Sequence, residues 1–133
     1  MLFRSGTWNK RAEQLNARLC DADLPIQVVN ISSIWTVCYT APCRYNWMLQ
    51  YYLRAEGLAL SWVGTGRLIF SLNYTDADFV AVADRFVAAA TAMQQGGWFW
   101  HDPAATNMAI KRTILKEMLA HRLLPALERK SAE

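Results

Sequence analysis

GLALSWVGTGRLIFSLNYTDADFVAVADRFVAAA, residues 57–90, is the stretch whose pattern decides the fold. Its apolar and aromatic residues predict a short strand at 58–62 and a second strand at 67–72. Gly64 and Gly66 predict a turn between them, because glycine adopts positive φ without steric cost. Alternation along the second strand places three apolar side chains on one face, and these are Leu68, Phe70 and Leu72.

A helix follows this strand pair at once. Thr75 is suited to the N-cap position, and Asp78 three residues later completes a near-capping box and favours the positive end of the helix dipole. Apolar residues then recur at helical spacing, so one face of the helix is expected to cover the sheet. That face comprises Phe79, Val82, Ala83, Phe86, Val87 and Ala90.

The residues before this unit add two helices and two strands. A helix is expected from about Thr7 to the segment before Pro25, because Pro25 disfavours helical backbone in the residue before it. β-branched and aromatic residues predict an antiparallel pair of strands within 25–40, and a helix is expected at 46–56 with Gly57 as its C-terminal stop. The inward face of the first helix comprises Trp8, Ala12, Leu15 and Leu19, and both faces of the later helix are expected to pack.

These elements predict an α+β fold with a small, largely antiparallel sheet of three or four strands packed against helices. Residues 1–95 would form this domain, and residues 96–133 would form an aromatic linker and an amphipathic helix packed on it. The last helix is expected at about 104–129, with Pro125 kinking or ending it. Its inward residues would be Ile110, Ile114, Met118, Leu119 and Leu123.

Composition excludes several classes of protein. The net charge of +3 comes from the C-terminal segment 106–133, and such a mild excess on an amphipathic helix is typical of a solvated face rather than of nucleic-acid binding. No apolar run approaches the ~20 residues that cross a bilayer, and no secretory leader is recognisable. Three cysteines without CxxC spacing predict buried free thiols and a cytoplasmic location; they are Cys20, Cys38 and Cys43.

The order of these elements resembles the C-terminal small domain of class III pyridoxal-phosphate-dependent aminotransferases, the group that includes glutamate-1-semialdehyde aminomutase. The resemblance covers about Phe3 to Met93 and depends on order and spacing. It is carried by Glu56-Gly57-Leu58, Arg67-Leu68-Ile69, Ser71-Leu72 and Thr75-Asp76-Ala77-Asp78.

The resemblance implies a role for Arg67, which matches the arginine that binds the substrate's α-carboxylate in many of these enzymes. A guanidinium can meet a planar carboxylate with two hydrogen bonds, and a strand fixes its direction. This sequence has Phe70 and Ser71 where many relatives have two prolines, and the aminomutase branch often lacks the arginine. The alternative is an edge-strand arginine that points to solvent or pairs with Asp76 or Asp78.

The resemblance also implies the cofactor and the partner. Pyridoxal phosphate would be bound by the intact parent enzyme, whose catalytic lysine and phosphate-binding loop belong to a large domain that these 133 residues lack. The four lysines, expected on solvated helix faces, are Lys10, Lys111, Lys116 and Lys130. The chain alone is therefore expected to bind no cofactor, to bind the large domain, and to form a homo-oligomer.

A second hypothesis is a stand-alone oligomerisation or interaction module that uses the same fold. The aromatic run 98–100 and the last helix would then lie in a groove of a partner. His101 and His121 are expected at the surface or at an interface, since no cysteine or carboxylate set completes a metal site around them.

Overall fold

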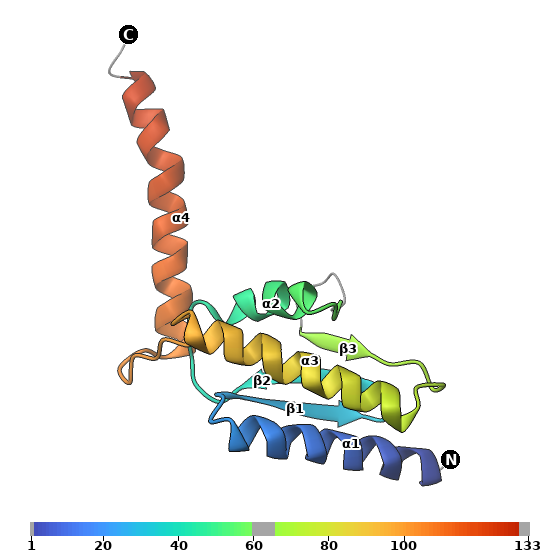
Figure 1. The fold of residues 1–133 in the computed structure, drawn as a ribbon. Helices are drawn as coiled ribbons and strands as arrows, with labels where there is room; N and C mark the ends of the chain where they lie inside the picture. The colour runs from blue at the N-terminus through green and yellow to red at the C-terminus, as the bar shows by residue number, and fades with distance from the viewer. Residues whose placement is uncertain (1, 60–65, 131–133) are drawn as a thin grey trace.

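The computed structural model describes residues 2–59 and 66–130, and Figure 1 shows how their elements are arranged. Helix α1 (Leu2–Asp21) is followed by strands β1 (Ile26–Ile31) and β2 (Ile34–Tyr39). A 3₁₀ turn η1 (Asn46–Met48) leads into helix α2 (Leu49–Ala55). Strand β3 (Arg67–Ile69), helix α3 (Asp76–Gln95) and helix α4 (Asn107–Lys130) complete the order, which confirms an α+β fold.

The sheet is antiparallel throughout its described part, with the strand order β1-β2-β3. The strand predicted at 58–62 lies largely outside the described residues, and its described part, Leu58 and Ala59, is not in a strand. Strand β3 ends at Ile69, earlier than predicted, and Leu72 is exposed rather than in the core. The chain still follows β2 for one more residue, because the Phe70 amide donates to the Ser33 carbonyl at 3.0 Å.

Three helices cover one face of the sheet. In Figure 1, α3 crosses in front of the sheet with α1 and α2 on either side of it. The core between the layers centres on Trp35 of β2, which is fully buried and meets Phe79 and Phe70 at ring-centroid distances of 5.0 and 5.2 Å. The predicted inward residues of α1 are all buried, and they are Trp8, Ala12, Leu15 and Leu19.

The N-terminus of α3 has the predicted cap. The Thr75 hydroxyl accepts from the Asp78 amide at 3.2 Å, and the Asp78 carboxylate accepts from the Thr75 amide at 2.8 Å. The Thr75 hydroxyl also donates to the Asp78 carboxylate at 2.7 Å, and this bond, together with that from the Thr75 amide, holds the pKa of Asp78 below its ordinary value. The reciprocal bonds satisfy backbone groups that a helix start otherwise leaves without a partner.

Replacing Thr75 by alanine is therefore expected to lower the free energy of unfolding by about 1 kcal/mol, because the Asp78 amide loses its acceptor. Thr75→Ser keeps the hydroxyl and should stay close to the parent protein. Urea denaturation followed by circular dichroism measures both. Equal losses in the two variants would show that the hydroxyl does not stabilise α3.

Helix α2 packs on one face only, so the expectation of two packed faces is wrong. Leu49 and Leu53 are buried against α3, whereas Trp47 and Tyr51 are more than half exposed and contact each other edge to face at 5.8 Å. Helix α2 ends at Ala55 with Gly57 as its C-terminal stop, as predicted. The φ of 86° at Gly57 turns the chain so that the Leu58 amide donates to the Leu53 carbonyl at 2.8 Å.

Helix α4 packs only part of its predicted inward face on the domain. Figure 1 shows it rising away from the three-helix layer, with contact at its base. Ile110 and Ile114 are half-buried there, but Met118 and Leu119 are exposed. Leu123 lies beyond the described side chains, and the helix continues past Pro125 to Lys130. Amphipathic spacing is present in the sequence, but it does not specify what covers the apolar side.

An ion pair joins α4 to the loop after β2. The two terminal nitrogens of Arg44 donate to the two carboxylate oxygens of Glu117 at 3.0 and 2.6 Å. The hydrogen bonds from Arg44 lower the pKa of Glu117 below its ordinary value. Because the folded pKa is depressed, the pair should contribute fully above the ordinary glutamate pKa and be lost as the pH falls through the lowered one.

An NMR titration of the Glu117 carboxyl should accordingly show an inflection below that of an unpaired glutamate. In Arg44→Gln the inflection is expected to return upward to the ordinary range, while Arg54→Gln on α2 should leave it unchanged. An unshifted inflection in the parent protein would mean that the pair does not persist in solution.

Candidate functional site

Arg67 lies at the start of β3, where the chain enters the sheet. Gly66 before it has a φ of 67°, and its carbonyl accepts from the Val37 amide at 2.9 Å. A side chain at Gly66 would be strained by that φ and would come within 3.4 Å of the Val37 Cβ. The predicted glycine is thus required at 66, whereas Gly64 is outside the described residues.

The alternation of the strand directs Arg67 away from the core. Leu68 is buried under the helices, so Arg67 and Ile69 are on the opposite face and are exposed. In register, Arg67 lies beside Thr36 of β2, which lies beside Val29 of β1. The guanidinium therefore belongs to the sheet face that no described helix covers.

That uncovered face is apolar next to the arginine. Two residues along the strands from Arg67, on the same face, a row crosses all three strands; it comprises Ile31, Ile34 and Ile69. Ile31 is 83% exposed and Ile69 is 68% exposed. We call this row with Val29 the isoleucine face. A cluster of exposed aliphatic side chains is typical of a surface that takes part in an interaction.

The carboxylates considered as partners of Arg67 are bound elsewhere. Asp76 accepts from Arg11 at 2.8 Å, and Asp78 belongs to the α3 cap. No hydrogen bond or ion pair of the Arg67 side chain occurs within residues 2–59 and 66–130. The structure thus gives an exposed arginine, and its substrate role stays a prediction.

Sequence reasoning missed Arg11 of α1. Arg11 is 8% exposed. The central carbon of its guanidinium lies 4.8 Å from the centroid of the Trp8 ring and 5.2 Å from that of Phe79. The guanidinium also donates to Asp76 and to the Tyr74 carbonyl. The one available signal was Trp8 three residues earlier on the helix; nothing local indicated the approach of Asp76. Arg11 ties α1 to the start of α3.

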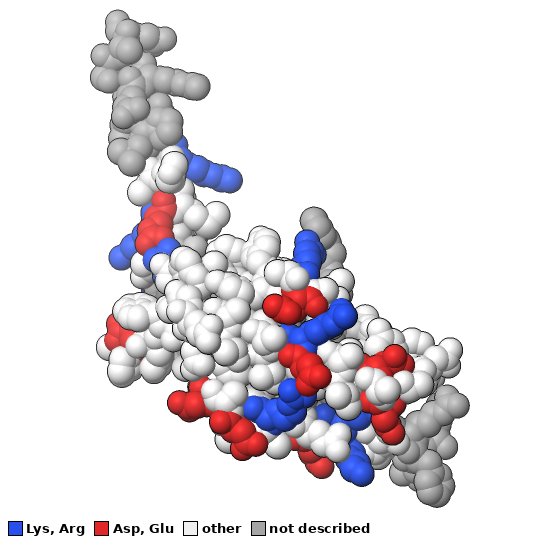
Figure 2. Space-filling model, in the orientation of Figure 1, with Lys and Arg blue, Asp and Glu red and all other residues white. Residues whose placement is uncertain are grey.

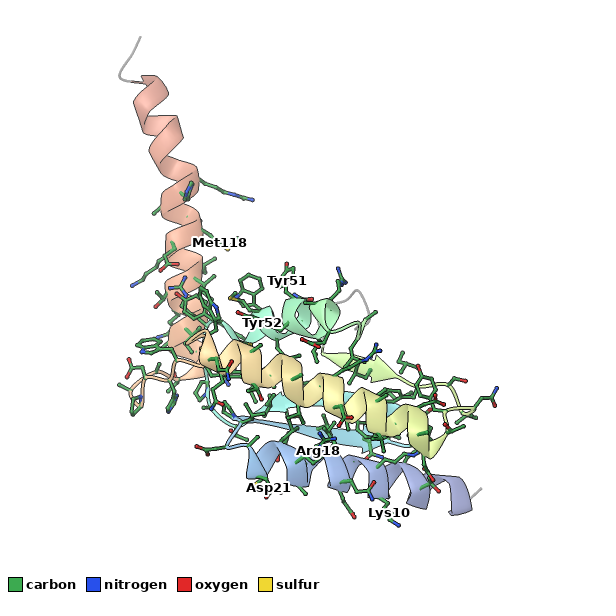
Figure 3. The ribbon with its side chains drawn as sticks, in the orientation of Figure 1. Lys10, Arg18, Asp21, Tyr51, Tyr52 and Met118 are labelled. Carbon is green, nitrogen blue, oxygen red and sulfur yellow. The ribbon has the colours of Figure 1, made fainter. Side chains whose placement is uncertain are left out.

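A groove of about 760 Å³ runs between α1 and α3. Lys10 and Arg18 project from α1 beside it (Figure 3). Arg18 is paired with Asp84 at 2.7 Å, as Arg11 is with Asp76, so the charges at the groove are largely matched. Figure 2 shows acidic and basic side chains interspersed over this helical surface, as is usual for a solvated face.

The described lysine side chains lie at the surface rather than in a desolvated pocket. A lysine that binds this cofactor must be desolvated beside a phosphate site. Lys10, Lys111 and Lys116 are exposed, and the side chain of Lys130 lies beyond the described ones. Within the described part of the chain no cluster of metal-ligating side chains occurs.

The remaining titratable and thiol groups are peripheral. His101 and His121 are exposed, as predicted, and a ring nitrogen of His101 lies 3.2 Å from the Pro42 carbonyl. The three cysteines are free thiols, but the expectation of burial is wrong for Cys20, which is exposed, and Cys38 and Cys43 are only half-buried. Among the described residues, no helix has the length and apolar content needed to cross a bilayer.

The layer of three helices on an antiparallel sheet defines the class of fold: it is consistent with the small domain of an aminotransferase. A solved structure that shares it is a β-phenylalanine aminotransferase from Variovorax paradoxus, with a TM-score of 0.55 and 22% identity. The match covers 74% of this chain and 24% of that enzyme, so the chain spans about a quarter of the length of its structural relative. Neither the protein-family models nor the curated proteins compared with the sequence match it.

Proposed function

We propose that this chain is the C-terminal small domain of a class III pyridoxal-phosphate-dependent aminotransferase or aminomutase, which closes over the active site and presents Arg67 to a substrate carboxylate. The observation that carries the proposal is the position of Arg67 beside the isoleucine face. An arginine on a strand, bordered by apolar side chains, suits a carboxylate site that a second domain completes and from which it excludes water.

The large domain is the proposed partner and the proposed holder of the cofactor. It would supply the catalytic lysine and the phosphate site, since the described lysines of this chain are exposed. The isoleucine face would pack against it, so that Arg67 reaches the cofactor pocket from the side. We further propose that the assembled enzyme pairs with a second copy and works in the cytoplasm, where free thiols persist.

The test is coexpression with the aminotransferase large domains encoded by the same genome, in the presence of pyridoxal phosphate. A stable complex with the visible absorbance of the bound cofactor is the expected result. Ile34→Asp should abolish the complex, because it places an unpaired charge in the interface. The matched control is Val80→Asp on the exposed side of α3, which should leave the complex intact. If none of these large domains binds, the proposal fails.

The alternative function, a stand-alone interaction module, is favoured by one observation. Helix α4 exposes apolar side chains that the domain itself does not cover. Removal of residues 97–133 should then abolish self-association measured by light scattering. If assembly is unchanged without these residues, the module hypothesis loses its support.

A further inference from the structure

One side of α4 carries large apolar and basic side chains that nothing in the described structure covers. Met108, Leu115 and Met118 are each more than half exposed, and Lys111 and Arg122 are exposed as well. Figure 3 labels Met118 on the part of α4 that rises clear of the three-helix layer. We call these five residues the α4 seam.

The residues of the seam follow the spacing of a coiled coil. From Met108 to Arg122 the steps between neighbours are three, four, three and four residues. This is the repeat that keeps the a and d positions of a helix facing a partner helix. Ile110 and Ile114, which contact the base of the domain, are not seam residues, so the seam is available while α4 stays attached.

The charges of the seam specify the chemistry of the partner. Leu115 and Met118 form its apolar centre, and Lys111 and Arg122 flank that centre one turn away on each side. Two further basic residues, Arg112 and Lys116, are exposed on α4, and basic side chains project from this helix in Figure 2. The one acidic residue at positions 107–122 is Glu117, which Arg44 already engages.

A second copy of the chain suits this seam less well than an acidic helix does. A parallel pair would place Lys111 against Lys111 of the other copy, and an antiparallel pair centred on Leu115 and Met118 would place Lys111 near Arg122. Both arrangements oppose like charges. A lipid surface suits it less well than a protein, because cations of interfacial helices lie on the polar face rather than within the apolar stripe.

We propose that the α4 seam is the docking site for an acidic amphipathic helix of a protein partner. That helix would place apolar side chains against Leu115 and Met118, and glutamate or aspartate opposite Lys111 and Arg122. The pairing forms a two-stranded coiled coil in which carboxylates select the partner and the apolar centre supplies affinity. This inference is independent of the role of Arg67.

The full chain can be tested against two designed helical peptides, each about three heptads long. Both carry leucine at the central seam positions; one has glutamate at the flanking seam positions and the other has lysine there. Fluorescence anisotropy should give a dissociation constant at least about tenfold lower for the glutamate peptide, and added salt should reduce that difference.

Variants of the chain assign the binding to the seam. Leu115→Glu should weaken binding of the glutamate peptide by about tenfold or more. Ala120→Glu introduces the same charge on the far side of the helix and should change binding less than about twofold. The pair Lys111→Glu and Arg122→Glu should reverse the preference, so that the lysine peptide binds more tightly. Circular dichroism of each variant verifies that the domain remains folded.

Several results would overturn the proposal. Equal affinity for the two peptides would remove the role of charge, and equal effects of Leu115→Glu and Ala120→Glu would remove the role of the seam. A dimer of the chain that Leu115→Glu dissociates would identify a second copy as the occupant. Binding to phosphatidylserine vesicles that Leu115→Glu abolishes, without peptide binding, would identify a membrane.

Discussion

Replacing Trp35 by alanine is expected to lower the free energy of unfolding by about 3–5 kcal/mol. The side chain is fully buried and lies among Trp8, Phe70 and Phe79, with ring centroids 6.5, 5.2 and 5.0 Å away. These aromatics come from α1, from the residue that follows β3, and from α3, so a cavity at Trp35 weakens contacts between the helices and the sheet. Urea denaturation monitored by far-ultraviolet circular dichroism measures the loss.

Two controls separate packing from other effects. Trp47→Ala removes a tryptophan that is more than half exposed and should change the free energy of unfolding by about 0.5 kcal/mol or less. Trp35→Phe keeps an aromatic ring and removes an indole N–H that has no partner among the described residues, so its cost should be well below that of alanine. A similar cost for alanine and phenylalanine would show that the core does not depend on the ring.

Replacing Arg67 by alanine in the proposed complex with a large domain is expected to reduce kcat/KM for a carboxylate substrate by about 30-fold or more, because a desolvated charge pair loses one partner. Arg67→Lys keeps the charge but not the two-pronged geometry, so it should recover only part of the loss. Steady-state kinetics of the purified complex measures each variant.

The specific role of the arginine appears in a comparison of substrates. With an amine substrate that lacks a carboxylate, Arg67→Ala should have little effect, since no group remains for the guanidinium to bind. Arg54→Ala, on the exposed side of α2, should be neutral with both substrates. An equal loss with both substrates would mean that Arg67 supports the domain contact rather than the substrate.

Local signals in the sequence predicted most of the fold. Thr75 and Asp78 form their cap within one helical turn, and the glycine at 57 ends its helix through neighbouring carbonyls. Such features depend on residues a few positions apart, so the sequence contains them entirely. The strand pair at β1 and β2 was predicted for the same reason.

Features that depend on distant contacts could not be predicted in this way. Arg11 is buried because Asp76, remote in the chain, reaches it, and no spacing on α1 indicates that. The residues expected inward on α4 are apolar at the correct intervals, yet Met118 and Leu119 meet no core. The candidate site was predicted only in part. The sequence indicated Arg67 through a resemblance, but the sheet face to which Arg67 belongs follows from the strand register in the structure.

The row of Ile31, Ile34 and Ile69 has a consequence for how this sequence can change over time. A solvent-facing isoleucine adds little to the folding of the chain that carries it, so selection for folding alone does not retain it. In lineages where this surface is no longer covered, these three codons should drift toward threonine or lysine. Where it is still covered they should remain aliphatic, and they should change together with the residues that meet them.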